Sequence, residues 1–353
     1  MNNLQILTNE IKSKLFSMSE YTKHQGMVGW LRSNTHKADY VYGEITGYFL
    51  SFCAYVYKRE QNTTEKKRIE NIIKNHVDWL NTTITTGLKT RYTLGTYEDW
   101  RNNALFAFDI AMIIRGLDDV KDIVSVSSVM AEYLEIVNKF ISPSGILTSV
   151  YTSASEPLPQ KWSTTFDVHL VKVAANLCGI PQWDNHCTEK TVDALKCIKF
   201  EELIKKDSHP IFYYLEGLLL LSGKNFIKDT SIIDYVTSIY IQLLAQGTIS
   251  NNSTTKEYMR SDVLSQQIRI GSILYSYGKL TKSEYSAIEK LVDYLIDNFY
   301  DEGYICFFEK DTPNNYYNAW CAMFAYQALD LFLNSKEKMI ESSNADFFYQ
   351  SVY

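Results

Sequence analysis

Proline and glycine are scarce in this chain of 353 residues, which contains six prolines and fifteen glycines. Proteins built from many short strands and turns use more of both residues, so the composition argues against a loop-rich β protein. Hydrophobic residues make up 46% of the chain, which is ample for a large buried core. We therefore expect a globular protein built mostly from helices.

Long apolar runs and long runs of basic residues are also lacking. The longest apolar stretches are too short to span a bilayer, and the start of the chain, residues 1–7, lacks the basic and apolar segments of a secretory signal. The formal net charge is −6 and no long basic run occurs, which makes nucleic acid a poor partner. We expect a soluble, cytoplasmic protein without a membrane span.

Metal-binding spacings are missing as well. The six cysteines show no C-x-x-C pair, and free buried thiols in a reducing compartment are the simpler interpretation. The adjacent His186 and Cys187 lack a matching second pair, which argues against a zinc site. We expect no metal ion and no other cofactor.

The chain does contain a repeated feature, a cluster of polar and aromatic residues that opens a long apolar segment. It occurs six times, and the marker residues of the openings are Glu44, Arg101, Trp162, His209, Arg260 and Asn318. The intervals between markers are 57, 61, 47, 51 and 58 residues, close to the length of one helical hairpin with its loops. The repeat predicts an all-α single domain over residues 1–353, in which six hairpins close into a ring with its core at about residues 30–335.

Two kinds of helix alternate along this repeat. Residues 68–81 and 286–299 carry apolar residues at helical spacing with a charged opposite face, which is typical of outer helices wetted on one side. Residues 104–114 and 211–221 are apolar almost all round, as expected for helices covered on every side. Glycine in the middle of such helices, as at Gly47, indicates close packing between neighbours.

The inner helices of such a ring run parallel, so their amino-terminal ends should meet around one cavity. Side chains in the first turns of each helix are then the candidate site, and backbone N–H groups there favour negative charge. The candidates for binding a substrate are Trp100, Arg101, Trp162, Asp167, Tyr213, Glu216, Arg260, Gln266, Asn318 and Trp320.

Carboxylates are the most informative members of this set. Glu44 and Asp262 each lie within three residues of a marker, and two facing carboxylates are what glycoside hydrolysis requires. The alternative for either residue is charge compensation at a helix amino terminus. Asp109 and Glu216 interrupt strongly apolar helices and therefore need a cation or a hydrogen-bond network. The candidate partners are Arg101, Arg115, Arg260 and Arg269.

Other side chains at the openings allow different chemistry. His209 is a candidate general acid or base, although a histidine next to a proline at a helix start also serves as a packing residue. Arg101 and Arg260 would hold a carboxylate or phosphate group. Residues 118–122 fit the D-D-x-x-D pattern that binds magnesium and diphosphate, but we place them just past the end of an inner helix, where they would cap the next one.

Several segments carry a resemblance to a known superfamily: residues 42–48, 100–103, 209–217, 260–264 and 318–325. They resemble the (α/α)6-toroid, six-hairpin glycosidase-like superfamily, and more narrowly its bacterial members associated with polysaccharide or glycoconjugate pathways. The likeness covers roughly residues 30 to 335. It is specific for the fold and only weakly specific for the reaction, because the superfamily contains hydrolases, lyases and epimerases.

The resemblance implies a carbohydrate-active enzyme that acts on an oligosaccharide, with acidic sugars among the candidate substrates. In a glycoside hydrolase, Glu44 and Asp262 would supply the acid and the base or nucleophile, and the tryptophans would stack on sugar rings. A polysaccharide lyase or sugar epimerase would instead use His209 or Tyr213 to move a proton. A non-catalytic binding protein and an isoprenoid or peptide cyclase are the remaining alternatives.

Overall fold

The structure is a computed structural model that describes residues 2–22, 26–94, 99–152, 157–196, 198–228, 231–246 and 259–337. The chain packs as two compact units. The first unit comprises residues 1–16, 31–36 and 197–352, and the second unit comprises residues 17–30, 37–196 and 353. Within the described ranges, no helix is both long and apolar enough to cross a membrane.

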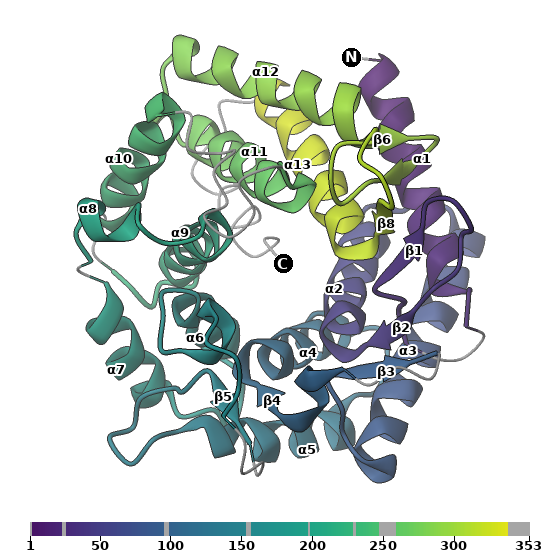
Figure 1. Cartoon of the computed structure of the whole chain (residues 1–353), viewed down its shortest axis with the longest axis vertical. Helices are drawn as coiled ribbons and strands as arrows, with labels where there is room; N and C mark the ends of the chain where they lie inside the picture. Colours follow the sequence, from purple (N-terminus) through teal and green to yellow (C-terminus); the bar gives the residue numbers. More distant parts are fainter. Residues whose placement is uncertain are drawn as a thin grey trace. The chain divides into compact units, whose positions relative to one another are not determined.

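The second unit consists of helical hairpins joined by short strands and turns. Its helices are α2 (Gly43–Arg59), α3 (Thr63–Thr86), α4 (Ala107–Val120), α5 (Ser127–Val137), α6 (Leu170–Leu177) and α7 (Asn185–Leu195). Its strands are β2 (Tyr40–Tyr42), β3 (Arg91–Thr93), β4 (Leu105–Phe106) and β5 (Val150–Tyr151), and its 3-10 turns are η1 (Trp100–Asn103), η2 (Asn138–Phe140) and η3 (Trp162–Thr164). Helix α4 packs between α2 and α6, as Figure 1 shows.

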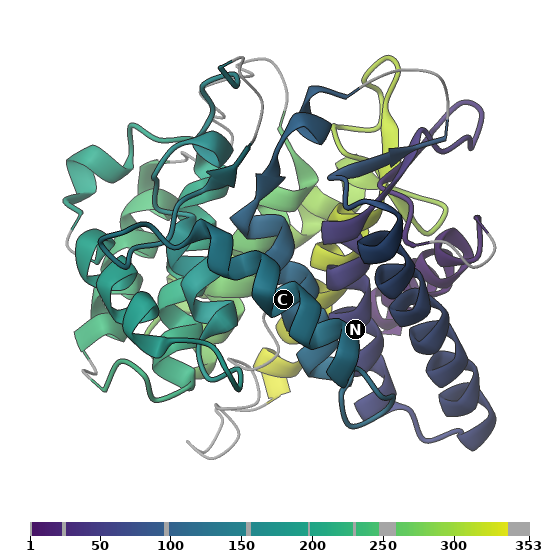
Figure 2. The same cartoon turned by 90° about the horizontal axis from the view of Figure 1, so that it is seen from below.

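Short strand pairs determine where the helices of this unit begin. Strand β2 pairs antiparallel with β3, with Tyr42 opposite Arg91, and helix α2 starts at the next residue. Strand β4 pairs in the same way with β5, and α4 follows directly after Phe106. In Figure 2 the blue strands of this unit lie at one end of its helices. The extended residues before α2 and α4 therefore fix the direction in which each helix enters the core.

Glycines allow α2 and α4 to approach closely. A Cβ atom at Gly116 would lie 2.2 Å from the Gly47 carbonyl oxygen, and one at Gly47 would lie 2.5 Å from the Met112 carbonyl oxygen. Only glycine leaves room for backbones at this separation. The close packing expected from Gly47 is confirmed, and Gly116 is the residue that faces it.

The first unit repeats the arrangement. Its helices are α8 (Phe200–Leu203), α9 (Ser208–Gly223), α10 (Ser231–Gln246), α11 (Ser261–Ser276), α12 (Lys282–Phe299), α13 (Ala319–Glu337) and most of α1 (Asn2–Ser19). Its strands are β6 (Tyr300–Asp301), β7 (Tyr304–Ile305), β8 (Tyr316–Asn318) and β1 (Trp30–Arg32), whose first residue belongs to the second unit. Helix α11 packs against α9, α12 and α13.

The two predicted kinds of helix are both present in the first unit. Nearly every residue of α9 is buried, whereas α12 buries a single stripe that includes Ile288, Val292 and Leu295. Helix α12 starts with a capping box between Thr281 and Glu284, which satisfies backbone N–H groups at its exposed end. The pattern of apolar residues in the sequence therefore distinguished fully buried helices from amphipathic helices.

Some boundaries differ from the prediction. The second apolar helix begins at Ala107 instead of residue 104, because Leu105 and Phe106 pair with β5. Helix α6 begins only at Leu170, so the Trp162 opening forms a separate 3-10 turn and Asp167 precedes the helix. Short pairing segments override helical propensity at these points.

The acidic segment at residues 118–122 was also misplaced. Asp118 and Asp119 lie inside the last turns of α4, which continues to Val120. Asp119 pairs with Arg115 one turn earlier, 2.8 Å from its Nε atom, and Asp118 pairs with Lys121. Asp118 and Asp119 therefore form ion pairs at the carboxyl-terminal end of α4 and do not cap the next helix.

Five of the six cysteines are free thiols buried in the core, as the sequence analysis predicted. The sixth, Cys197, lies outside the described residues.

Candidate functional site

The amino-terminal ends of the long buried helices meet within each unit. In the second unit, Tyr42 before α2 contacts Asp109 in the first turn of α4, and Phe108 contacts His169 just before α6. In the first unit, His209 at the start of α9 contacts Gln266 of α11, and Trp320 at the start of α13 contacts Asp262 of α11. Parallel neighbouring helices, as predicted, account for both gatherings.

The second unit holds two carboxyl groups in contact, which we call the carboxyl pair: Glu44 and Asp109. Glu44 lies close enough to Asp109 and Tyr42 for both side chains to affect its pKa. Tyr42 also donates to Asp109 Oδ2 across 3.1 Å. Asp109 is buried, whereas Glu44 retains some exposed surface. The pair can therefore be reached from solvent through Glu44.

Burial makes this pair hold a proton near neutral pH. It raises the pKa of Glu44 to about 7, against the opposing effect of the Tyr42 hydrogen bond. Burial and the negative charge of Glu44 together raise the pKa of Asp109 well above its usual range. Two carboxylates in contact cannot both ionise cheaply, so they share one proton as a unit. A carboxyl group that stays protonated at pH 7 is a competent general acid.

Two arginines lie beside the carboxyl pair and limit its negative charge. Arg91 Nη1 lies 2.9 Å from Asp99 Oδ2, and Arg101 Nη1 lies 3.1 Å from Asp99 Oδ1. The positive charges of Arg91 and Arg101 both lower the pKa of Glu44. Arg101 keeps 30% of its side chain exposed and packs over the Trp100 ring, with 4.8 Å from guanidinium carbon to ring centre. This exposed, stacked guanidinium is available to an anionic group of a ligand.

Sequence reasoning missed Arg91 and left Asp109 open between a structural ion pair and a catalytic role. Arg91 sits under the Tyr40 ring, 4.3 Å from its centre, in a strand that belongs to none of the six openings. Its position depends on the pairing of β2 with β3, which brings Tyr42 opposite Arg91. Asp109 could have been recognised, because an acid in the first turn of an apolar helix follows the same pattern as Glu44.

The predicted residues Trp162 and Asp167 belong to a neighbouring aromatic group. The Trp162 ring lies 5.0 Å from the His169 ring and 6.5 Å from the Phe108 ring, both in edge-on contact. Asp167 accepts a hydrogen bond from the backbone N–H of Val168. Trp162 remains partly exposed, so it keeps a surface that a sugar ring could cover.

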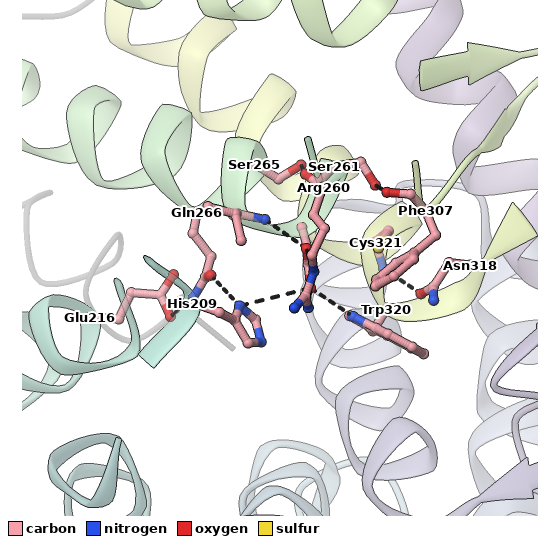
Figure 3. A network of polar contacts seen from close by, with 12 residues as sticks. His209, Glu216, Arg260, Ser261, Ser265, Gln266, Phe307, Asn318, Trp320 and Cys321 are labelled. Atoms are coloured by element: carbon pink, nitrogen blue, oxygen red, sulfur yellow. Dashed lines mark hydrogen bonds and ion pairs between the residues drawn. The ribbon is translucent and has the colours of Figure 1, made fainter. Parts of the chain in front are cut away.

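The first unit holds a second group, in which Asp262 pairs with Arg260 and lies near His209. Figure 3 shows Arg260, His209 and their neighbours. Arg260 grips Asp262 with two nitrogens, and its Nε atom lies 3.1 Å from Oδ1. The Trp320 indole N–H donates to the same carboxylate across 3.2 Å. Arg260 is therefore already paired, which argues against its predicted role as a free grip for an acidic ligand.

These contacts set the protonation states of the group. Burial raises the pKa of Asp262, but the charge of Arg260 and the hydrogen bonds from Arg260 and Trp320 together outweigh burial and lower the pKa to about 2, so Asp262 is ionised. Burial lowers the pKa of His209 to about 4, so its imidazole is neutral at pH 7. His209 Nδ1 lies 2.7 Å from Gln266 Oε1 and 3.8 Å from Asp262 Oδ2.

Glu216 is fully buried and pairs with Arg269, one of its predicted partners. Arg269 Nε donates to Glu216 Oε1 across 3.0 Å, and Arg269 Nη1 donates to Gln327 Oε1 across 2.8 Å. Gln266 Nε2 lies 3.4 Å from Glu216 Oε2, which connects this ion pair to His209. Glu216 is thus a supporting residue with no exposed surface rather than a substrate contact.

The remaining predicted residues lie around the same group. The Tyr213 ring is 4.2 Å from the His209 ring, and Asn318 Oδ1 accepts from the backbone N–H of Cys321 at the start of α13. Glu44 belongs to the second unit and Asp262 to the first. The pairing of these two carboxylates in one active site stays a prediction, as does the single-domain organisation.

Comparison with solved structures identifies the fold. A D-mannose isomerase matches over 95% of this chain and 98% of its own, with a TM-score of 0.72 and 10% sequence identity. An unsaturated glucuronyl hydrolase specific for heparin matches over 96% and 99%, with a TM-score of 0.64 and 10% identity. An α-1,6-mannanase from Salegentibacter matches over 94% and 99%, with a TM-score of 0.61 and 10% identity.

The chain has the six-hairpin, (α/α)6-toroid fold. This confirms the all-α fold class and the resemblance inferred from the openings. No protein-family model matches the sequence, and no curated protein matches it. Sequence identity of 10% to enzymes with different reactions shows the fold alone, so function has to be argued from the site.

Proposed function

We propose that this protein is a carbohydrate-active enzyme that hydrolyses a glycosidic bond, with the carboxyl pair Glu44–Asp109 as its general acid. The observation that carries the proposal is the placement of a buried Asp109, held by the Tyr42 hydroxyl group across 3.1 Å, beside the half-buried Glu44. Burial raises the pKa of both carboxyl groups, which favours a proton on the pair near pH 7. Glycoside hydrolysis requires a protonated carboxyl to donate to the leaving oxygen. Glu44 is the member with exposed surface and therefore the one that would reach a substrate.

Aromatic and cationic side chains near the pair support a carbohydrate substrate. Trp100 is partly exposed and stacks with Arg101, whose guanidinium also remains accessible. An aromatic face provides apolar contact for a sugar ring, and a guanidinium binds a carboxylate in bidentate fashion. This combination favours an oligosaccharide that bears an acidic sugar. Two solved structures that share this fold are an α-1,6-mannanase and an unsaturated glucuronyl hydrolase.

Hydrolysis also needs an ionised carboxylate as base or nucleophile. The sequence assigns this role to Asp262, and the ionised state of Asp262 suits the role. The bidentate contact with Arg260 lowers the basicity of Asp262, which makes it a weak base. The role of Asp262 as the second carboxylate therefore stays a prediction from the sequence.

The test is product release from a panel of acidic and neutral oligosaccharides, followed by mass spectrometry. Glu44→Gln and Asp109→Asn should each reduce turnover of a cleaved substrate by about 100-fold or more, because they remove the shared proton. Asp118→Asn is the matched control, since Asp118 lies on the same helix as Asp109 and pairs only with Lys121 in the contacts described above. Equal activity of Glu44→Gln and Asp118→Asn would exclude the carboxyl pair as the acid.

A sugar isomerase or epimerase is the second candidate, and one observation favours it. His209 is neutral and hydrogen-bonded, which suits a base that removes a proton next to a carbonyl group. The D-mannose isomerase in the comparison shares the fold. Exchange of substrate hydrogen with deuterated water, lost in His209→Gln but retained in Glu44→Gln, would favour this candidate over hydrolysis.

A further inference from the structure

A continuous chain of buried side chains runs from Arg269 to His209 and joins α11 to α9. Its members, which we call the His209 relay, are Arg269, Glu216, Gln266 and His209, and Figure 3 shows the last three in contact. Glu216, Gln266 and Arg269 have no exposed surface, and His209 is 5% exposed. Buried polar groups in contact must present donors to acceptors, so the hydrogen-bond directions in this chain can be worked out.

The hydrogen-bond directions follow from Arg269, because its side chain is always protonated. Arg269 is a permanent cation that offers only donors, so the buried Glu216 beside it is an ionised carboxylate that only accepts. Gln266 must therefore turn its amide nitrogen toward Glu216, as it does across 3.4 Å. The amide oxygen of Gln266 is left facing His209 Nδ1 at 2.7 Å. An amide oxygen only accepts, so the proton of the neutral imidazole lies on Nδ1.

We propose that Gln266 and Glu216 are positioning residues that hold His209 as its Nδ1–H tautomer, so that Nε2 is the unprotonated, basic nitrogen of the ring. The inference goes beyond the proposed hydrolysis, because it concerns the first unit and holds whichever reaction the enzyme performs. In Figure 3 the second ring nitrogen points away from Gln266.

Charged groups around His209 are consistent with this assignment. Asp262 Oδ2 lies 3.8 Å from Nδ1, on the same side of the ring as Gln266, and it too can only accept. Arg260 is occupied by Asp262 in a two-nitrogen contact and opposes a second positive charge on His209. Tyr213 packs its ring against the imidazole and restricts its orientation. Both acceptors on the Nδ1 side therefore favour the same tautomer.

The neighbouring Gln267 provides a matched control on the same helix. It is as fully buried as Gln266, but its amide oxygen and nitrogen have no hydrogen-bond partner within the described part of the chain. Replacing either glutamine by methionine keeps the volume and removes the amide. Only the Gln266→Met change breaks the relay.

The experiment is nitrogen-15 NMR of the histidine side chains at pH 7, with the His209 signals assigned from the His209→Gln variant. The wild-type protein and Gln267→Met should show the proton fixed on Nδ1 and an unprotonated Nε2. Gln266→Met should lose the single fixed tautomer, with a proton signal appearing on Nε2. Thermal melting of each variant confirms that it is folded before the tautomers are compared.

Two results would overturn the inference. One is a wild-type His209 that carries its proton on Nε2. The other is a folded Gln266→Met variant that keeps the proton fixed on Nδ1, which would assign tautomer control to Asp262 alone. Gln266→Glu supplies an independent check: a second carboxylic group beside His209 should raise the imidazole pKa, measured in the same spectra. An unchanged His209 pKa in that variant would also contradict the relay.

Discussion

Arg269 and Glu216 form an ion pair in which neither side chain has any exposed surface. The pair joins α9 to α11, and Arg269 further bonds to Gln327 on α13. The Arg269 guanidinium group thus links three helices of the first unit. Removing one member leaves an uncompensated buried charge, whereas removing both leaves an apolar contact.

Glu216→Leu should therefore lower the free energy of unfolding by about 3 to 5 kcal/mol. The double variant Glu216→Leu with Arg269→Met should regain most of that loss, because no buried charge remains. Urea denaturation of the two variants and the wild-type protein measures both values. A double variant as unstable as the single one would show that the pair contributes through geometry beyond its charges.

The Glu216 case shows what could be read from the sequence. A carboxylate within an apolar helix must find a cation, and Arg269 was one of four candidates. The choice among the four could not be made, because it depends on how α9 and α11 pack against each other. The six openings predicted the fold correctly because helical periodicity is a local property of the sequence. Fully buried helices and amphipathic helices therefore have different patterns of apolar residues.

The surroundings of the carboxyl pair could not be predicted from the sequence. Glu44 was chosen from its place at a helix start, but its contact with Asp109 follows from the close approach of α2 and α4 at Gly47 and Gly116. Arg91 reaches the pair only because β3 pairs with β2. Contacts of this kind join residues about 50 to 70 positions apart, and no local pattern encodes their register.

Gly47→Ala should destabilise the protein by about 1 to 3 kcal/mol, because the new methyl group would overlap the Met112 carbonyl group on the neighbouring helix. Gly43→Ala is the control on the same helix. The nearest atom to its new methyl group is the flexible end of Ile113 at 3.3 Å, and alanine is the better helix former. Thermal unfolding compares the two; equal melting temperatures would contradict the close contact between α2 and α4.

The carboxyl pair should make stability fall as pH rises. The folded pKa of Glu44 is raised from 4.5 to about 7, so the folded state binds more protons than the unfolded state between these values. Its contribution is complete below about pH 4.5 and is lost as pH rises through about 7. Glu44→Gln cannot titrate, so its stability relative to the wild type should rise over this interval by about 1 to 3 kcal/mol. Denaturation midpoints at pH 5 and pH 8 measure the change, and parallel curves would disprove the raised pKa.

The ion pair of Asp262 with Arg260 should have the opposite pH dependence. The folded pKa of Asp262 is lowered from 3.8 to about 2, so its contribution is present above about pH 4 and lost as pH falls toward 2. Asp262→Asn should cost about 3 kcal/mol at pH 7, because Arg260 keeps only 17% of its side chain exposed and would lose its partner.

Asp234→Asn is the control for this prediction, because the ion pair of Asp234 with Lys279 lies at the surface, where Asp234 is 67% exposed. Its loss should cost less than about 1 kcal/mol at any pH. Urea denaturation at pH 7 and at pH 3 separates the two variants: the deficit of Asp262→Asn should shrink at the lower pH, while that of Asp234→Asn stays small. A deficit for Asp262→Asn that is equally large at both values would mean that Asp262 stabilises the first unit by packing and not by its charge.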